Sequence, residues 1–257
     1  MANICEDLHR YGRIYIDMTN SLISISNIAK QLGVSIDTLR RWDKTHRLPS
    51  TRIGPRGHRY YRQADIDLFL RNDIYLARQW AMSTVGSTPP SEVYCQTRDV
   101  FQVRLERLQG QLQRVVPEST MSLLCAIAGE IGNNSFDHNL GNWPDVTGIY
   151  FSFDLRNGYI VLADRGLGIL TTLKRALPEL KDTDEALKIA FTETISGRRP
   201  EVRGNGLKFV RQVVIDNPFT LMFQTGDVYL NLKQNDRDVI ISHTDGNIRG
   251  CLAIINF

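Results

Sequence analysis

Apolar residues recur at helical spacing in two short stretches near the start of the chain, residues 24–32 and 35–44, with Gly33 between them. The polar side of the second stretch carries Arg40 and Arg41. Two short helices separated by a glycine turn are typical of a helix-turn-helix. The candidate N-caps are Ser24 or Ser26 for the first helix and Ser35 or Asp37 for the second.

A stretch rich in proline, glycine and basic residues follows, from Pro49 to Tyr61. Its turn residues, 54–57, favour a hairpin, or wing, between two short extended segments. Helical spacing resumes over residues 64–70. Residues 83–92 combine prolines with serine, threonine and glycine, and they are the strongest linker candidate in the chain.

The next region begins with two helical patterns. Phe101, Leu105, Leu108 and Leu112 are separated by steps of four and three residues, which places them on one helical face. This face can serve as a dimer seam or as core within a domain, and we favour the core interpretation. Pro117 breaks the chain, and a second helix is predicted from about residue 118 to 139.

The remainder mixes strands with helices. Strands are predicted at 148–155 and 159–164, joined by a tight turn at Asn157-Gly158. Later helices are expected at about 168–176, 184–191 and 207–215, and later strands at about 220–224, 228–232, 239–243 and 251–257. The fold class is therefore α+β, with a mixed, mostly antiparallel sheet and helices on one face.

These patterns divide the 257-residue chain into segments. We expect an N-terminal arm at 1–22, a winged helix-turn-helix at 23–72, a linker at 73–97 and a larger α/β sandwich domain at 98–257.

Composition is ordinary for a globular protein, with 42% hydrophobic and 23% charged residues. The charge is uneven: from Lys30 to Arg62, nine basic residues stand against two acidic ones, whereas the whole chain carries only +3. The first domain therefore suits a polyanion and the rest of the chain does not. The four cysteines are far apart, no apolar run is long enough for a membrane span, and no signal pattern opens the chain, so we expect a cytoplasmic protein with no membrane partner.

The basic region carries a specific resemblance. Residues 28–42, IAKQLGVSIDTLRRW, and residues 57–61, GHRYY, resemble the helix-turn-helix and the wing of MerR-type DNA-binding domains. The resemblance implies binding to double-stranded DNA, usually as a homodimer, with phosphates contacted from the second helix and the wing and bases read by Thr38. The DNA-binding residues that we predict are Thr38, Arg40, Arg41, Arg56, His58, Arg59 and Tyr60.

A polar stripe lies on the predicted helix at 118–139. Glu130, Asn134 and His138 follow one another at intervals of four residues and so share one face. Polar groups on an otherwise apolar helix cost desolvation unless a partner uses them. On its own the stripe is as well explained by a polar helix edge that is already hydrogen-bonded.

Two glycine-containing segments follow that stripe. An apolar strand ends in Asp164-Arg-Gly166-Leu-Gly168, where a carboxylate can accept a hydrogen bond from an amine and glycines allow close backbone approach. Farther on, Gly204-Asn-Gly206-Leu207 precedes a helix, where backbone N–H groups can hold a phosphate. Each segment alone is equally compatible with an ordinary turn or loop.

In this order, the three segments resemble the GHKL ATPases, and the spacing of the first looks closest to the anti-sigma-factor kinase branch. The resemblance implies ATP and Mg²⁺ as cofactors: Asn134 would coordinate Mg²⁺, Glu130 would orient or deprotonate the attacking group, and Asp164 would read adenine. A mobile lid would lie between about 171 and 203. The remaining residues implied around the nucleotide are His138, Gly166, Gly168, Arg203, Gly204, Gly206 and Leu207.

The chain departs from that family's pattern at Gly250-Cys251, where many relatives have Gly-Thr. It has no P-loop motif, and the third glycine of a dinucleotide fingerprint is replaced by Thr171.

The combination predicts an ATP-responsive DNA-binding transcriptional regulator. The alternative is a serine/threonine protein kinase or anti-sigma-like switch that acts on a small antagonist-type partner protein. Glu130 is compatible with either a Mg-dependent ATPase or a kinase, and a module that binds ATP without turnover is a third hypothesis.

Overall fold

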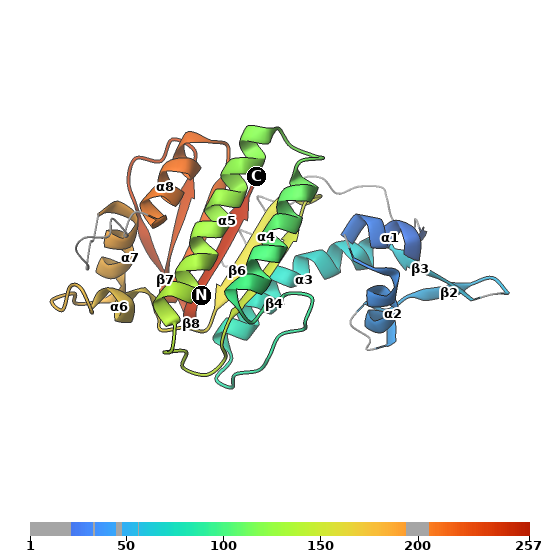
Figure 1. The fold of residues 1–257 in the computed structure, drawn as a ribbon, viewed down its shortest axis with the longest axis horizontal. Helices are drawn as coiled ribbons and strands as arrows, with labels where there is room; N and C mark the ends of the chain where they lie inside the picture. Colours follow the sequence, from blue (N-terminus) through green and yellow to red (C-terminus); the bar gives the residue numbers. More distant parts are fainter. Residues whose placement is uncertain (1–21, 33, 45–47, 56, 194–205) are drawn as a thin grey trace. The chain divides into compact units, whose positions relative to one another are not determined.

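The computed structural model describes residues 22–257 apart from 33, 45–47, 56 and 194–205, and only the backbone of 67, 68 and 70–72. The chain divides into two compact units, Met1–Asn72 and Asp73–Phe257. Helix α3 (Gln63–Met82) begins in the first unit and ends in the second (Figure 1). Its last ten residues, 73–82, are helical where the sequence pattern favoured a linker.

The first unit contains the expected helix-turn-helix and wing, together with one strand that the pattern did not predict. Its three-stranded antiparallel sheet has the order β1-β3-β2, so the extra strand β1 extends the wing hairpin on its far side. The elements before α3 are β1 (Leu22–Ser24), α1 (Ile25–Leu32), α2 (Ile36–Lys44), β2 (Thr51–Ile53) and β3 (His58–Arg62).

An apolar cluster holds these short elements together. Leu39 and Trp42 of α2 are buried, and the Trp42 ring packs on Phe69 of α3 with ring centroids 5.0 Å apart. Tyr61 of β3 is also buried and donates a long hydrogen bond of 3.4 Å to the Leu39 carbonyl. Because these contacts bury the apolar side of α2, its basic side faces outward.

The second unit is built around a five-stranded antiparallel sheet with the order β4-β5-β6-β8-β7. Its strands are β4 (Tyr94–Cys95), β5 (Ile149–Asp154), β6 (Tyr159–Asp164), β7 (Thr220–Lys233) and β8 (Ile241–Asn256). Its helices beyond α3 are α4 (Arg98–Leu112), α5 (Glu118–Asn139), α6 (Gly168–Leu173), α7 (Thr183–Thr192) and α8 (Gly206–Asp216).

The sheet is covered on both faces. Phe151, Ile160 and Leu162 belong to the core cluster that α4, α5 and α8 share, and these helices lie in front of the sheet in Figure 1. Tyr150 and Val161, on the other face, pack with residues of the α3 end such as Ala77, Trp80 and Ala81. The expected fold is therefore corrected in two respects: helices lie on both faces, and every strand pair among the described residues is antiparallel.

Two later elements also differ from expectation. The four short C-terminal strands merge into the long pair β7 and β8, because a register shift around Gly226 lets the hairpin bend without ending. Within the segment expected to form a lid, α7 is a packed helix: Ala186, Leu187 and Phe191 are buried. An apolar face of this kind belongs to the core rather than to a mobile cover.

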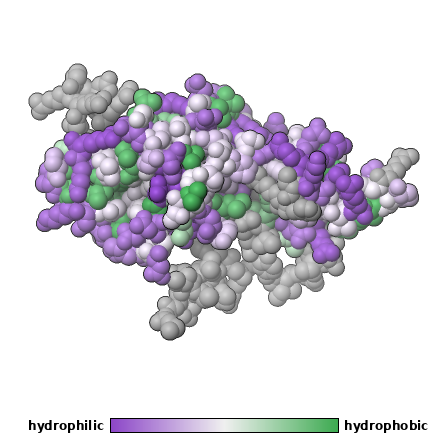
Figure 2. All heavy atoms as spheres, turned by 90° about the horizontal axis from the view of Figure 1, so that it is seen from below, coloured by the Kyte–Doolittle hydropathy of each residue, from purple (hydrophilic) through white to green (hydrophobic). Residues whose placement is uncertain are grey.

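The surface of the molecule shows no large apolar face in the view of Figure 2. Hydrophilic residues cover most of the described surface drawn there, and hydrophobic residues form small separate patches. Within the described part of the chain, no helix combines the length and the apolar character that a membrane span requires.

Two glycines in neighbouring helices should respond oppositely to alanine. A β-carbon at Gly132 of α5 would overlap the ring of buried Phe101, which also packs against Phe151 in an edge-on arrangement. Gly132→Ala should therefore lower the free energy of unfolding by about 1–3 kcal/mol. A β-carbon at Gly110 of α4 meets nothing within 4 Å, so Gly110→Ala should raise it by about 0.5–1 kcal/mol. Urea denaturation measures both, and shifts of the same sign would contradict this packing.

Candidate functional sites

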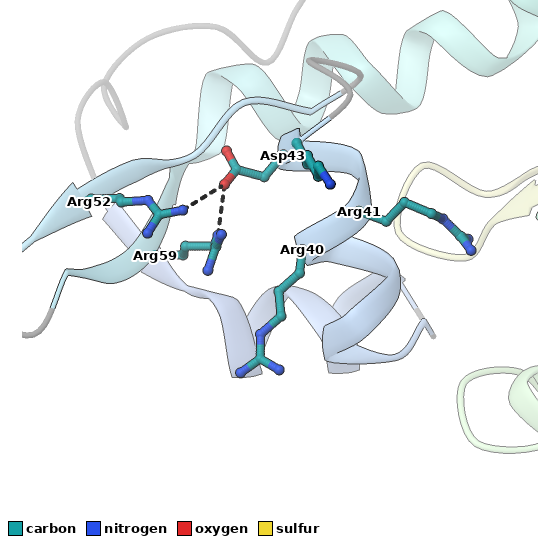
Figure 3. Close-up of a pocket in the computed structure, with 6 residues that line it drawn as sticks. Arg40, Arg41, Asp43, Arg52 and Arg59 are labelled. Carbon is teal, nitrogen blue, oxygen red and sulfur yellow. Dashed lines mark hydrogen bonds and ion pairs between the residues drawn. The ribbon is translucent and has the colours of Figure 1, made fainter.

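A basic pocket lies between α2 and the wing (Figure 3). Ser35 immediately precedes the second helix, and its hydroxyl accepts a hydrogen bond from the Thr38 backbone N–H at 3.0 Å. With the apolar side of the helix buried, the cations of the following turn remain near the surface. The residues that line the pocket are Arg40, Arg41, Asp43, Lys44, Arg52 and Arg59.

Asp43 is the acidic residue of this pocket. Its carboxylate accepts a 2.7 Å hydrogen bond from Arg59 Nε and a 2.9 Å hydrogen bond from the Ser50 backbone N–H, and Arg52 Nη2 lies 3.8 Å away. Burial alone would raise the pKa of Asp43, but the hydrogen bonds from Arg59 and Ser50 outweigh it, and the pKa is lowered. Asp43 therefore stays ionised and joins α2 to both wing strands.

The structure brings three of the predicted DNA-binding residues, Arg40, Arg41 and Arg59, to this one pocket. Thr38 lies on α2 about one turn before Arg41, and its hydroxyl oxygen is 2.9 Å from the hydroxyl oxygen of Ser35. His58 and Tyr60 lie on β3, and Arg56 falls outside the described residues. The prediction omitted three residues of the pocket, Asp43, Lys44 and Arg52. Asp43 is one of only two acids in a strongly basic segment, and that rarity was the available signal.

The second candidate site lies along α5, whose bounds match the predicted helix. Glu130 and His138 are exposed on it, and Asn134 is half-buried. Ser135, the next residue, donates a 2.8 Å hydrogen bond to the carboxylate of Asp164 at the end of β6. This bond joins α5 to the strand-end aspartate across 29 residues of sequence, at the residue that follows Asn134 of the stripe.

Asp164 lies in a tight backbone environment. Its carboxylate accepts a 2.8 Å hydrogen bond from the Gly166 backbone N–H. A β-carbon at Gly250, where φ is +66°, would overlap the Asp164 side chain, so only glycine fits there. Burial raises the pKa of Asp164 to about 6, although the hydrogen bonds from Ser135, Gly166 and Cys251 oppose the shift.

Gly206, the first residue of α8, approaches the polar stripe closely. A β-carbon at this position would lie 2.6 Å from Glu130 Oε2 and 3.3 Å from Asn134 Nδ2. The backbone at the N-terminus of α8 thus lies beside the two stripe residues to which we assigned metal and catalytic roles. Leu207 is half-buried and packs against the main core cluster of the unit. Arg203 and Gly204 lie outside the described residues, as does residue 194 onward of the expected lid.

Two polar residues that the sequence pattern missed hold the segment after Asp164 in place. Asn139 accepts a 2.8 Å hydrogen bond from the Leu167 backbone N–H. Thr225 of β7 accepts one of 3.3 Å from Ile169 and donates one of 2.9 Å to the Gly250 carbonyl. Thr225 is the register partner of Cys251, so a hydroxyl is present beside the position where we noted the missing threonine.

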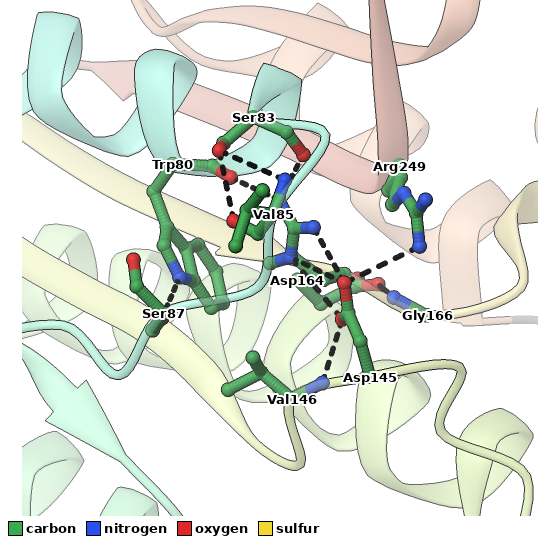
Figure 4. Close-up of polar contacts among 10 residues, drawn as sticks. Trp80, Ser83, Val85, Ser87, Asp145, Val146, Asp164, Gly166 and Arg249 are labelled. Atoms are coloured by element: carbon green, nitrogen blue, oxygen red, sulfur yellow. Dashed lines mark hydrogen bonds and ion pairs between the residues drawn. The ribbon is translucent and has the colours of Figure 1, made fainter.

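Arg165 follows Asp164 and bonds to the end of α3, which packs on the opposite face of the sheet. Its partners Trp80, Ser83 and Asp145 are labelled in Figure 4. Its guanidinium is fully buried, pairs with Asp145 at 2.5 Å and donates to the carbonyls of Trp80 and, at 2.8 Å, Ser83. Asp145 also accepts a 3.3 Å hydrogen bond from Arg249. The hydrogen bond from Arg165 lowers the pKa of Asp145. This network anchors the end of α3.

Comparison with known protein families identifies the helix-turn-helix of the first unit. Residues 23–71 match the family model described as MerR HTH family regulatory protein. The chain is also 33% identical, over 69 residues, to the type II methyltransferase M.Eco47II of Escherichia coli. That similarity covers 27% of this chain and 16% of the methyltransferase. The MerR-family helix-turn-helix inferred from residues 28–42 and 57–61 is thus confirmed.

The raised pKa of Asp164 predicts a pH dependence of stability. Because the folded protein binds this proton more tightly than the unfolded chain, stability falls as pH rises from 3.8 to about 6. The loss attributable to this group is about 3 kcal/mol. Asp164→Asn cannot titrate, so its stability relative to the natural protein should improve by about that amount between pH 4 and pH 7.

Denaturation across this range measures the difference, and carboxyl NMR gives the titration midpoint of Asp164 directly. Ser135→Ala removes a hydrogen bond that lowers the pKa of Asp164, so the midpoint should move higher still. A midpoint near 4, or a stability difference that is the same at every pH, would contradict the buried environment.

Proposed function

We propose that this protein is a DNA-binding transcription regulator whose second unit binds ATP with Mg²⁺ and adjusts DNA binding in response. The DNA-binding half follows from the MerR-family match and from the basic surface of α2 and the wing. Such domains read two half-sites as dimers, so the proposal includes a homodimer on double-stranded DNA.

The nucleotide half is supported by one observation: Asp164 and Gly206 both contact α5, at Ser135 and at Asn134 respectively, which are adjacent residues. Ser135 joins the helix to Asp164, and a β-carbon at Gly206 would crowd both Glu130 and Asn134. A glycine at a helix N-terminus, with its backbone close to an amide and a carboxylate, is suited to a phosphate held by backbone N–H groups.

The residues present fit ATP and Mg²⁺. The amide oxygen of Asn134 is a hard ligand suited to Mg²⁺, and Asp164 can accept a hydrogen bond from the adenine amine. Gly166 and Gly168 shape the backbone next to Asp164, while Gly204 and Gly206 would contact phosphates with Arg203 and His138 nearby. When bound, the metal–nucleotide pair supplies a transferable phosphoryl group and a strong local positive charge.

Glu130 sets the choice between regulator and enzyme. It is exposed and lies beside Gly206, so its carboxylate can orient a water or a hydroxyl near the phosphate end of the site. The alternative function is therefore a serine/threonine kinase or anti-sigma-like switch that phosphorylates a small antagonist-type partner. Release of phosphate to water supports the first function, and transfer to a protein hydroxyl supports the second.

DNA binding should weaken with salt, since the pocket cations replace counterions on phosphates. Arg40→Ala should reduce affinity and lower the slope of log affinity against log salt by about one. The matched control is Arg114→Ala, which removes an exposed arginine from the second unit and should leave the slope unchanged. Fluorescence anisotropy with duplex DNA measures both. Absence of binding at low salt, or equal effects of the two variants, would refute this interface.

Nucleotide binding is tested by calorimetry with ATP in the presence and absence of Mg²⁺. Asn134→Ala should lose the Mg²⁺-dependent part of the affinity, and Asp164→Asn should weaken adenine nucleotides generally. Asn133→Ala replaces the neighbouring asparagine of α5 and serves as the control. Glu130→Gln should keep binding and lose phosphate release or transfer, whereas unchanged turnover would remove Glu130 from the chemistry. If no adenine nucleotide binds, the nucleotide half of the proposal fails.

A further inference from the structure

Two arginines face each other across the wing. Arg52 of β2 and Arg59 of β3 are direct register partners, so their side chains leave the same face of the hairpin. Like charges directly opposite each other on a sheet repel, and two unconstrained arginines in this position would splay apart. A negative charge nearby is needed to balance that repulsion if both guanidinium groups are to be directed at the same site.

Asp43, on α2, provides the negative charge that balances these two wing arginines. Its carboxylate lies 2.7 Å from Arg59 Nε and 3.8 Å from Arg52 Nη2, so one negative charge adjoins both cations, as Figure 3 shows. The backbone N–H of Ser50 fixes the carboxylate in turn, at 2.9 Å. The three charges sum to +1, and the surrounding pocket residues Arg40, Arg41 and Lys44 add no further acid.

The guanidinium groups retain donors for another partner. Arginine has five N–H donors, and Arg59 directs Nε at Asp43, which orients the plane of its two terminal nitrogens. Side-chain exposure is 21% for Arg59 and 58% for Arg52, against 14% for Asp43. The acid is therefore the covered member of the group, and the cations are the members nearer to solvent.

We propose, on the basis of the DNA-binding half of the proposed function, that Asp43 is a positioning residue that holds Arg52 and Arg59 together as a clamp for one DNA phosphate. A carboxylate on a DNA-facing surface ordinarily repels the phosphate backbone. Here the loss of orientation outweighs the loss of repulsion, so removing the negative charge weakens DNA binding.

The opposite signs of these two effects make the test decisive. Asp43→Asn keeps the shape of the side chain and raises the net charge by one, which simple electrostatics predicts will tighten binding. The clamp instead predicts an affinity loss on the order of tenfold and a salt slope reduced by about one. Duplex DNA is the probe, and anisotropy is measured with the full chain at several salt concentrations.

Asp37→Asn is the matched control for charge. Asp37 is an exposed acid on the same helix, 2.8 Å from Arg40, and lies outside the set that lines the pocket. Its removal should leave DNA affinity unchanged or raise it. Equal losses in the two variants would overturn the clamp, because any acid on α2 would then have the same effect.

A double-mutant cycle separates positioning from folding. If Asp43 acts through Arg59, Asp43→Asn should add little to the loss already caused by Arg59→Gln. Arg59→Lys keeps the positive charge but removes the fixed guanidinium plane, and it should lower DNA affinity as Asp43→Asn does. It tests the clamp independently if Asp43→Asn folds poorly. Thermal melting identifies the temperature at which each protein is folded.

The outcomes distinguish this inference from the function on which it rests. If the natural protein binds no duplex DNA, the proposed function fails. If the natural protein binds and Asp43→Asn binds as tightly or more tightly, or if Arg59→Lys binds like the natural protein, the clamp is wrong and DNA binding stands.

Discussion

A strand buried on both faces sends consecutive side chains into two different environments, and the organisation of the second unit depends on such a strand, β6. Its apolar residues pack against α5 on one face and against the end of α3 on the other. At its C-terminal end the alternation continues with charged residues. Asp164 accepts a hydrogen bond from Ser135 of α5, and Arg165 donates to the carbonyls of Trp80 in α3 and of Ser83 just after it.

That alternation explains why Asp164 can carry an unusual pKa. The sheet and α5 exclude water from its carboxylate, and the hydrogen bonds that reach it come mostly from groups that the strand and helix already hold. Arg165, equally buried, is compensated by Asp145 and by backbone carbonyls. The strand end is therefore both a rigid anchor for α3 and a preorganised hydrogen-bonding position facing α5.

Sequence reasoning was most successful where local signals were strong. Pro117 marked the start of α5, and Asn157-Gly158 marked the hairpin between β5 and β6, because turn chemistry is written in adjacent residues. It failed where the determining contact is distant: α3 extends past 72 since Ala77 and Trp80 find a sheet face, and β7 and β8 continue through Gly226 because each supports the other.

The same division applies to the candidate sites. The spacing of Glu130 and Asn134 indicated a shared helical face, but the contact of Gly206 with both depends on how α8 packs. Ser135, Asn139 and Thr225 have no motif of their own, because a hydrogen bond between elements leaves no local pattern in either segment. Arg165 stood inside a predicted motif, yet its burial is a property of the fold around it.

Among the described residues, Asp43 and Asp145 each lie between two arginines, and the two groups differ in how exposed the arginines are. Arg165 beside Asp145 is fully buried, and its donors are directed at Asp145, Trp80 and Ser83, so it can only support the fold. Around Asp43 the order is reversed, with the acid covered and the arginines more exposed. Because Asp43 is largely covered, it repels an approaching phosphate only weakly, and it still holds the guanidinium groups of Arg52 and Arg59 in position. A buried arginine such as Arg165 therefore stabilises the fold, whereas the more exposed arginines beside Asp43 remain available for the phosphate contact that we propose.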